Sequence, residues 1–189
     1  MITEHKNPWL YYTIDNYFPV DLFKEISYSI QDFIENGYKG MHESQNGILQ
    51  KSSDIINVIG NEALASFNKL AKDKAYSLYN VDIKEKRKYN EIKFMEGGGN
   101  YPIHDESLNK ILSVVVYMYP MINSDTLGTK IYDIKKHYHS TIEWIPNRAM
   151  IFMRETGVSW HSYDNPTADV RVTCNHFLLD NTISFTNSI

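Results

Sequence analysis

Residues 101–119 are YPIHDESLNKILSVVVYMY. The first part is short and polar, and it leads directly into a run rich in β-branched residues, which favour strands. Side chains alternate between the two faces of an extended segment, so His104 and Glu106 share one face while Asp105 points to the other. An imidazole and a carboxylate side by side at the edge of a strand can supply two ligands of a metal site.

The third ligand of such a site has to come from elsewhere in the chain. The candidate is His161, in the segment Ser159-Trp160-His161-Ser162. Two histidines and one carboxylate on one side of a metal form the facial triad, which leaves coordination positions open for substrate and dioxygen. The sequence therefore predicts a metal site made of His104, Glu106 and His161.

Short strands are predicted to recur throughout the second half of the chain. The polar–apolar alternation of Glu91-Ile92-Lys93-Phe94 indicates a strand, which Gly97-Gly98-Gly99 is expected to break. Turn residues separate the further predicted strands, at 111–118, 130–134, 141–145, 149–153, 159–162 and 170–179. Helices followed by many evenly spaced short strands favour the α+β class with an antiparallel sandwich or jelly roll.

The first part of the chain, residues 1–89, is expected to be mainly helical. An opening strand and turn at 9–18 precede an amphipathic helix with apolar positions from Leu22 to Ile34, Asp21 as N-cap and Gly37 as C-cap. A loop is predicted from 38 to about 53. A second helical region is predicted at 54–79, divided at Gly60 and Asn61. The basic run at 84–88 is interpreted as a solvated connection.

Length and composition indicate one soluble domain over residues 1–189. With 42% hydrophobic and 13% aromatic residues the chain can bury a substantial core. A net charge of −4 and a pI near 6.0 give no electrostatic basis for binding nucleic acid. No segment has the pattern of a signal peptide or a membrane helix. The single cysteine, Cys174, suits a reducing compartment, so we expect a cytoplasmic location.

Taken in order, these residues resemble the 2-oxoglutarate- and Fe(II)-dependent dioxygenase superfamily, in its prolyl-hydroxylase-like branch from phages and marine bacteria. That family carries a His-x-Asp/Glu pair, a distal histidine and an arginine further along. The chain has His104-Asp105-Glu106, then His161, then Arg171-Val172-Thr173. The match continues at Lys110, Tyr117, Gly128-Thr129 and 144–148. The resemblance covers roughly residues 90–180. It implies a double-stranded β-helix, or cupin-like jelly roll, with the N-terminal helices packed on one side.

The resemblance also implies a cofactor and a reaction. His104, Glu106 and His161 would bind Fe(II), and 2-oxoglutarate and O2 would be cosubstrates. The implied reaction couples decarboxylation of 2-oxoglutarate to succinate with hydroxylation of a C–H bond in a peptidyl or small polar substrate. Aspartate is the usual carboxylate at the position of Glu106, and the extra methylene displaces the carboxylate. Asp105 is the alternative ligand, but the alternation of side chains turns it away from His104.

Three further residues are expected to bind 2-oxoglutarate, on the strength of the same resemblance. Arg171 would bind its distal carboxylate, because a guanidinium binds a carboxylate through two parallel hydrogen bonds. Thr173 lies on the same strand face as Arg171 and would add a hydroxyl donor, and Tyr117 would add a phenol donor.

Two other interpretations stay open at this stage. One is a cupin-like jelly roll that binds a metal or small ligand without catalysis, which the glutamate at position 106 favours. The other is a structural jelly roll in which His104 and His161 lie apart. A second metal site at His137 and His139 is less favoured than a solvated turn, because no carboxylate or cysteine accompanies the two histidines at ligand spacing.

Overall fold

The β-branched run forms the strand β6 (Lys110–Tyr119), at the centre of a curled antiparallel sheet. The structure is a computed structural model that describes residues 1–37, 42–43 and 48–182. On either side of β6 lie β9 (Ala149–Met153) and β11 (Arg171–Asp180). The order along the sheet is β1-β2-β9-β6-β11-β5-β10-β7-β8. This is the jelly-roll architecture that the sequence predicts.

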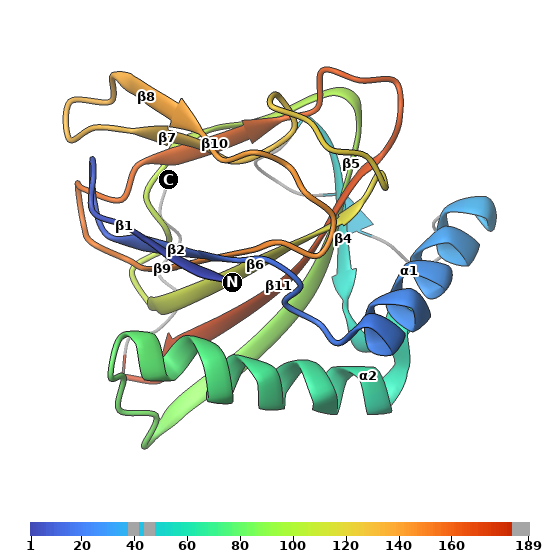
Figure 1. The fold of residues 1–189 in the computed structure, drawn as a ribbon, viewed down its shortest axis with the longest axis horizontal. Coiled ribbons are helices and arrows are strands. Elements are labelled where there is room, and N and C mark those ends of the chain that lie inside the picture. Colours follow the sequence, from blue (N-terminus) through green and yellow to red (C-terminus); the bar gives the residue numbers. More distant parts are fainter. Residues whose placement is uncertain (38–41, 44–47, 183–189) are drawn as a thin grey trace.

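The sheet curls so that its two ends face each other. Figure 1 shows β7, β8 and β10 as one layer and β1, β2, β9, β6 and β11 as the opposite layer. The strands not yet given bounds are β1 (Ile2–His5), β2 (Tyr11–Ile14), β3 (His42–Glu43), β4 (Ile48–Asp54), β7 (Lys130–Tyr132), β8 (Tyr138–Thr141) and β10 (His161–Asp164). The pair β3–β4 extends from β5 outside the main order.

One long strand, β5 (Lys86–His104), belongs to both layers. Its first half pairs with β11, from Lys86 to Met95, and its last residues pair with β10, from Asn100 to His104. The expected break at Gly97-Gly98-Gly99 is therefore a bend inside one strand. The bend needs glycine, because a Cβ at Gly97 would lie 2.4 Å from the backbone oxygen of Thr167, and Gly98 has a φ of +79°.

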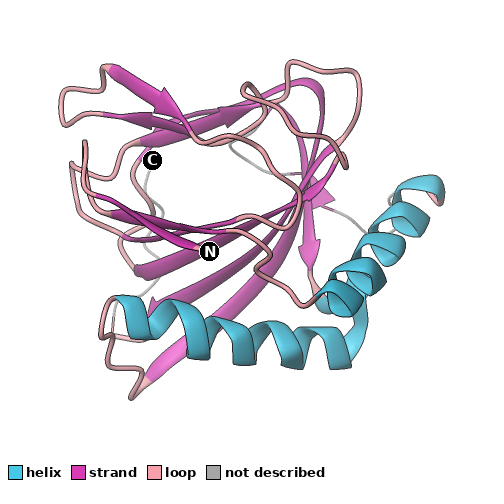
Figure 2. Ribbon diagram, viewed as in Figure 1, coloured by secondary structure: helices cyan, strands magenta, loops and turns pink. Residues whose placement is uncertain are grey.

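The helices cover the outer face of the larger layer, as Figure 2 shows. They are α1 (Val20–Glu35), α2 (Ile56–Leu70) and the π-helical turn η1 (Ala71–Tyr76) that continues α2. Alternate residues of β6 point to the two faces of the sheet, so Val114 and Val116 pack under the helices while Tyr117 faces the interior. Burying a side chain the size of Phe67, which is fully covered, contributes about 1.5–3 kcal/mol to stability.

The predicted division of the second helix is confirmed, but the predicted cap of the first is wrong. Gly60 has a φ of +78° inside α2, where two helical segments meet at a kink. At α1 the N-cap is Pro19, and Asp21 lies in the first turn without a capping hydrogen bond. Asn36 is the C-cap, and Gly37 follows it with a φ of +73°.

Other predictions for the first part of the chain also need correction. All the described helices lie within residues 1–89, as predicted, but β1, β2, β3 and β4 lie there too. β4 occupies the end of the predicted loop at 38–53, whose residues 38–41 and 44–47 lie outside the described part of the chain. The basic run is exposed as predicted, apart from the half-buried Lys86, but it is not only a connection, because Lys86 begins β5 and its Nζ lies 2.8 Å from Asp180 Oδ2.

The predicted strand at 141–145 is displaced in the structure. β8 ends at Thr141, and the next residues leave the sheet edge to fill the interior, where Ile142 and Trp144 are buried. Alternating apolar residues can fill the core without forming a continuous strand. The sequence pattern alone does not distinguish this case from a strand.

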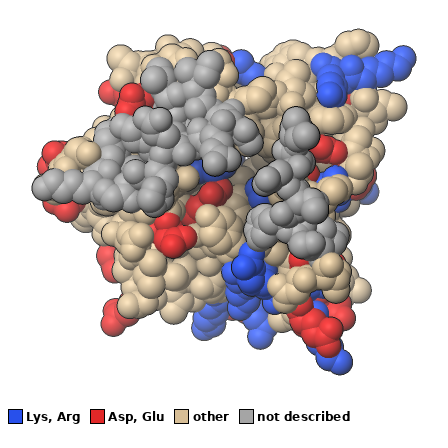
Figure 3. All heavy atoms as spheres, turned by 180° about the vertical axis from the view of Figure 1, so that it is seen from behind, with Lys and Arg blue, Asp and Glu red and all other residues tan. Residues whose placement is uncertain are grey.

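The surface carries charges of both signs. On the face seen in Figure 3, lysine and arginine side chains are interspersed with aspartate and glutamate. This agrees with the formal net charge of −4. Among the described helices, none combines the length and the apolar character that crossing a membrane requires.

Candidate metal centre and inner cavity

The structure brings the three predicted metal ligands together. His104 is the last residue of β5, Glu106 follows it by two positions, and His161 begins β10. His161 pairs with His104 across the two strands, and their ring centroids are 4.2 Å apart. The ligand atoms of the three side chains all lie within 4.8 Å of one another, the only such group among the described residues.

Both imidazoles are held in the tautomer that a metal needs. The Nδ1 of His104 lies 2.9 Å from the Pro102 carbonyl oxygen, and the Nδ1 of His161 lies 2.8 Å from that of Ser159. A carbonyl can only accept, so each Nδ1 carries the proton and each Nε2 keeps its lone pair. Burial lowers the pKa of both histidines, so both rings are neutral near pH 7.

The carboxylate of Glu106 is fixed at both of its oxygens. The hydroxyl of Ser113 donates to Oε1 at 2.9 Å, and the ammonium of Lys110 donates to Oε2 at 2.6 Å. Burial by itself would raise the pKa of Glu106. Lys110 and the two histidines outweigh that effect and hold the pKa well below its usual range. A buried, ionised carboxylate beside two neutral imidazoles fits a divalent iron site.

Asp105 points away from this group, as the strand alternation predicts. Its Oδ2 accepts a hydrogen bond from the Gly157 amide at 2.7 Å and lies 4.0 Å from Nη2 of Arg154. Its carboxylate therefore fastens the loop before β10.

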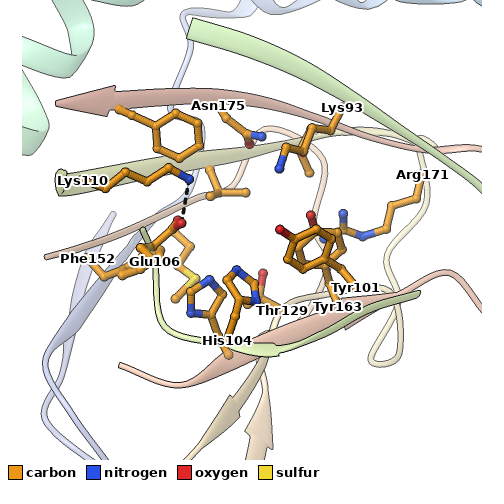
Figure 4. Close-up of a pocket in the computed structure, with 15 residues that line it drawn as sticks. Lys93, Tyr101, His104, Glu106, Lys110, Thr129, Phe152, Tyr163, Arg171 and Asn175 are labelled. Atoms are coloured by element: carbon orange, nitrogen blue, oxygen red, sulfur yellow. Dashed lines mark hydrogen bonds and ion pairs between the residues drawn. The ribbon is translucent and has the colours of Figure 1, made fainter. Parts of the chain in front are cut away.

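An inner cavity opens beside the three ligands and extends between the two layers (Figure 4). Its walls combine apolar side chains, among them Val115, Met150 and Phe152, with polar ones. The polar side chains are Lys93, Tyr101, Lys110, Thr129, Tyr163, Arg171, Thr173 and Asn175. A largely enclosed site with a few placed polar groups is typical of a small-ligand site.

Arg171 lies in this cavity, buried to 2% exposure at the start of β11. Its Nε donates to the Leu127 carbonyl at 2.8 Å, and its guanidinium carbon lies 4.7 Å from the ring centroid of Tyr163 and 5.0 Å from that of Trp144. Its Nη2 is buried without a hydrogen-bond partner in the structure. A buried cationic donor of this kind is suited to an anionic ligand.

The two hydroxyl residues predicted beside Arg171 differ in position. Thr173 lines the cavity. Tyr117 lies behind the lining, where its phenol donates to Thr129 Oγ1 and accepts from the Thr129 amide, each at 3.0 Å. The prediction that Tyr117 contacts the cosubstrate directly is therefore corrected. Its phenol is already used, and Thr129 presents the hydroxyl to the cavity.

Four polar residues of the cavity were not predicted from the sequence as part of the site: Lys93, Tyr101, Tyr163 and Asn175. Asn175 lies on β11 four residues after Arg171, and its buried Oδ1 has no partner in the structure. The sequence did contain a signal for Asn175. It lies an even number of residues after Arg171 on the same strand, so both side chains are expected on one face of the sheet. Alternating polar residues on a strand usually form its solvent-exposed face. In β5, however, Lys93 lines the cavity.

A second, outer pocket adjoins the metal ligands. It shares Tyr101, His104, Glu106 and Lys110 with the inner cavity, and its wall also includes Arg154 and Trp160. His104 and Glu106 thus border both the inner cavity and a more open pocket. His137 and His139 lie away from both, on an exposed turn and at the exposed start of β8.

Solved structures share this fold. A prolyl hydroxylase from Trichoplax adhaerens, in complex with a hypoxia inducible factor peptide fragment, matches with a TM-score of 0.69 at 17% identity over 91% of this chain and 84% of its own. A Pseudomonas putida prolyl-4-hydroxylase matches with a TM-score of 0.66 at 11% identity, covering 90% and 92% of the two chains. A viral collagen prolyl hydroxylase from Paramecium Bursaria Chlorella virus-1 gives 0.64 at 11% identity, covering 89% and 94%.

No family model matches the sequence, and no curated protein matches it. The chain has the double-stranded β-helix fold of the 2-oxoglutarate/Fe(II) oxygenases, as the resemblance predicts.

Proposed function

We propose that the protein is an Fe(II)- and 2-oxoglutarate-dependent dioxygenase that hydroxylates a peptidyl or small polar substrate. One observation carries the proposal. Two neutral histidines and an ionised glutamate converge within 4.8 Å beside a cavity that also contains the Arg171 guanidinium, whose Nη2 has no hydrogen-bond partner in the structure. A structural jelly roll, in which the two histidines would lie apart, does not account for this convergence.

In this proposal, one group of residues would bind the metal and another would bind the cosubstrate. His104, Glu106 and His161 would hold Fe(II), which supplies the oxygen chemistry when bound. Arg171 would bind the distal carboxylate of 2-oxoglutarate with its free donor, and Thr173 and Thr129 would add hydroxyl groups. The enclosed cavity excludes bulk water from the cosubstrate.

The outer pocket is where we place the substrate. It borders His104 and Glu106 but has its own wall, with Arg154, Thr156 and Trp160, so a substrate there and a cosubstrate in the inner cavity would occupy different linings. A peptide partner is supported by analogy with the Trichoplax enzyme, which was solved with a peptide. We also propose that residues 1–189 act as one domain, in a reducing cytoplasmic environment that suits the buried free thiol of Cys174.

The test is an anaerobic titration of the protein with Fe(II), with and without 2-oxoglutarate, monitored by the visible metal-to-ligand charge-transfer band. We expect the band in the wild type, its loss in His104→Ala and His161→Ala, and a higher 2-oxoglutarate requirement in Arg171→Met with Fe(II) binding unchanged. Lys86→Met, whose ion pair with Asp180 lies outside the cavity, is the matched control. Iron binding with no band in the wild type would contradict the proposal.

A further inference from the structure

The outer pocket contains an arginine to which the proposed function gives no role. Arg154 directly follows β9 and lines this pocket with a side chain that is 12% exposed. Its Nε donates to the main-chain carbonyl of Glu106 at 2.6 Å. The carboxylate of Glu106 has other partners, Lys110 and Ser113. The contact with Arg154 therefore fixes the guanidinium beside the metal ligands without using a ligand atom.

The outer edge of this guanidinium is open. Neither Nη group of Arg154 donates a hydrogen bond to a residue in the part of the chain that the structure describes. Oδ2 of Asp105 lies 4.0 Å from Nη2, beyond hydrogen-bond distance, and it already accepts from the Gly157 amide at 2.7 Å. Two parallel N–H donors of a guanidinium match the two oxygens of a carboxylate, so the open edge is suited to an incoming carboxylate.

A further positive charge lies at the wall of the same pocket. Nζ of Lys136, on the turn between β7 and β8, lies 3.9 Å from the ring centroid of Trp160, which lines the pocket. The pocket lining itself contains equal numbers of carboxylates and cations, so Lys136 makes the local charge positive. A positive pocket favours an anionic ligand.

Apolar side chains form another part of this wall. Ile103, near the end of β5, is 38% exposed, and Leu108, in the turn before β6, is 54% exposed. Together with the indole of Trp160 they place apolar surface in the same pocket as the open guanidinium. Such a combination is typical of a site for a ligand with an apolar body and a polar end.

We propose that the outer pocket binds its substrate by a carboxylate, held by Arg154, and by an apolar side chain next to that carboxylate. The apolar side chain packs on Ile103, Leu108 and Trp160. The substrate is then an acid with an apolar side chain, either an N-acyl amino acid or the C-terminal residue of a peptide. The inference rests on the proposed function and deepens it, because it assigns a substrate class to the pocket beside the metal ligands.

The experiment compares acids with their amides by calorimetry, on protein loaded with redox-inert Zn(II) and saturated with 2-oxoglutarate. The small probes are N-acetyl-leucine and its amide, and the peptide probes are acetyl-Ala-Ala-Leu with a free or an amidated C-terminus. Acid and amide differ at one group, so the ratio of their affinities reports on the carboxylate and not on the shape of the pocket. Bound 2-oxoglutarate keeps the carboxylate of the probe away from the metal.

Removing Arg154 alone would deprive Asp105 of its counter-ion, so the test compares the double variant Asp105→Asn/Arg154→Met with Asp105→Asn. An asparagine side chain still offers an acceptor to the Gly157 amide. Arg87→Met is the matched control, because Arg87 is exposed on β5 and lines neither pocket. Zinc content and melting temperature confirm that each variant is loaded and folded.

We expect the wild type, Asp105→Asn and Arg87→Met to bind the acids about ten- to a hundred-fold more tightly than the amides, the usual effect of a hydrogen bond to a charged group. The double variant should bind acid and amide alike. A preference shown by both pairs of probes would assign the site to small acids, and one confined to the peptides would assign it to peptide C-termini.

Equal or undetectable binding of acid and amide by the wild type would overturn the proposal. So would a preference for the acid that persists in the double variant, or one that is lost in Asp105→Asn, which keeps the guanidinium. Failure of the proposed function is read separately, from a lack of 2-oxoglutarate binding by the zinc-loaded wild type before any probe is added.

Discussion

Lys110 Nζ lies 2.6 Å from Oε2 of Glu106, and the two residues stand four positions apart, on either side of the turn that leads into β6. Ser113 holds the other oxygen at 2.9 Å. The glutamate is one methylene longer than the aspartate usual at the matching position of the family that the sequence resembles. These two contacts give the longer side chain a fixed end point beside the histidines.

The first prediction concerns Ser113. Its replacement by alanine removes the hydrogen bond that orients Oε1, and loss of such an outer partner typically costs about ten- to a hundred-fold in metal affinity. We expect Ser113→Ala to bind Fe(II) at least about tenfold more weakly in an anaerobic titration, and Ser113→Thr to retain wild-type affinity. Ser27→Ala, which removes a hydroxyl from the surface of α1, should have no effect.

The second prediction concerns the length of the carboxylate. Glu106→Asp retracts both oxygens from Lys110 and Ser113, so the shorter ligand loses the two contacts that fix it. We expect a larger loss of Fe(II) affinity than in Ser113→Ala, although aspartate is the residue that the family uses. Tight iron binding by Glu106→Asp would show that the two contacts do not position the ligand.

The third prediction separates two glycines. A Cβ at Gly128 would lie 1.5 Å from the backbone oxygen of Ile142, whereas one at Gly37 would meet nothing within 4 Å. Gly128→Ala must therefore displace the segment that positions Thr129, and we expect a loss of about 3 kcal/mol or more in urea unfolding. Gly37→Ala, strained only by its φ of +73°, should lose about 1–2 kcal/mol. Equal losses would mean that the close approach at Gly128 relaxes without cost.

The fourth prediction is a pH dependence of stability from His176. Its ring is buried on β11 between the Tyr76 hydroxyl at 2.6 Å and Asn90 Oδ1 at 2.8 Å, and burial lowers its pKa from 6.5 to about 3. Between those two values the unfolded chain takes up a proton that the native protein does not. The contribution of His176 to the free energy of unfolding should therefore fall by about 1.4 kcal/mol per pH unit as the pH drops below about 6.

The contribution of His176 is isolated by comparison. Denaturant titrations at several pH values should show a shallower fall in His176→Gln than in the wild type. The exposed His137 offers a control, and His137→Gln should follow the wild-type curve. A wild-type slope in His176→Gln would assign the acid sensitivity to other groups.

The local sequence pattern was sufficient to predict those residues whose position in the fold follows from their immediate sequence neighbours. The valine run predicted β6, and alternation placed His104 and Glu106 on one face. The local pattern did not predict the position of Lys93, because a charged residue that alternates with Ile92 and Phe94 is expected to face solvent. Here that face is the inside of a barrel with its own counter-ion, Glu91. Pairing between distant strands creates this interior, and no short window contains it.

Tyr117 shows the opposite failure. Its place among the matched positions was right, but the hydroxyl that reaches the cavity belongs to Thr129, twelve residues later. Which of two hydrogen-bonded hydroxyls faces a ligand depends on side-chain packing, here the stacking of Tyr117 on Trp144 with ring centroids 4.6 Å apart. Sequence spacing cannot resolve that choice.

The path of β5 has a consequence for the order of folding. The strand carries Lys93 where it pairs with β11 and His104 where it pairs with β10, and both partners come from the last third of the chain. During synthesis, the cavity-lining groups of β5 therefore have no fixed place until those final strands have left the ribosome. Contacts of such long sequence separation form slowly. In a nascent chain that lacks its last strands, the inner cavity and the cluster of His104, Glu106 and His161 stay unassembled.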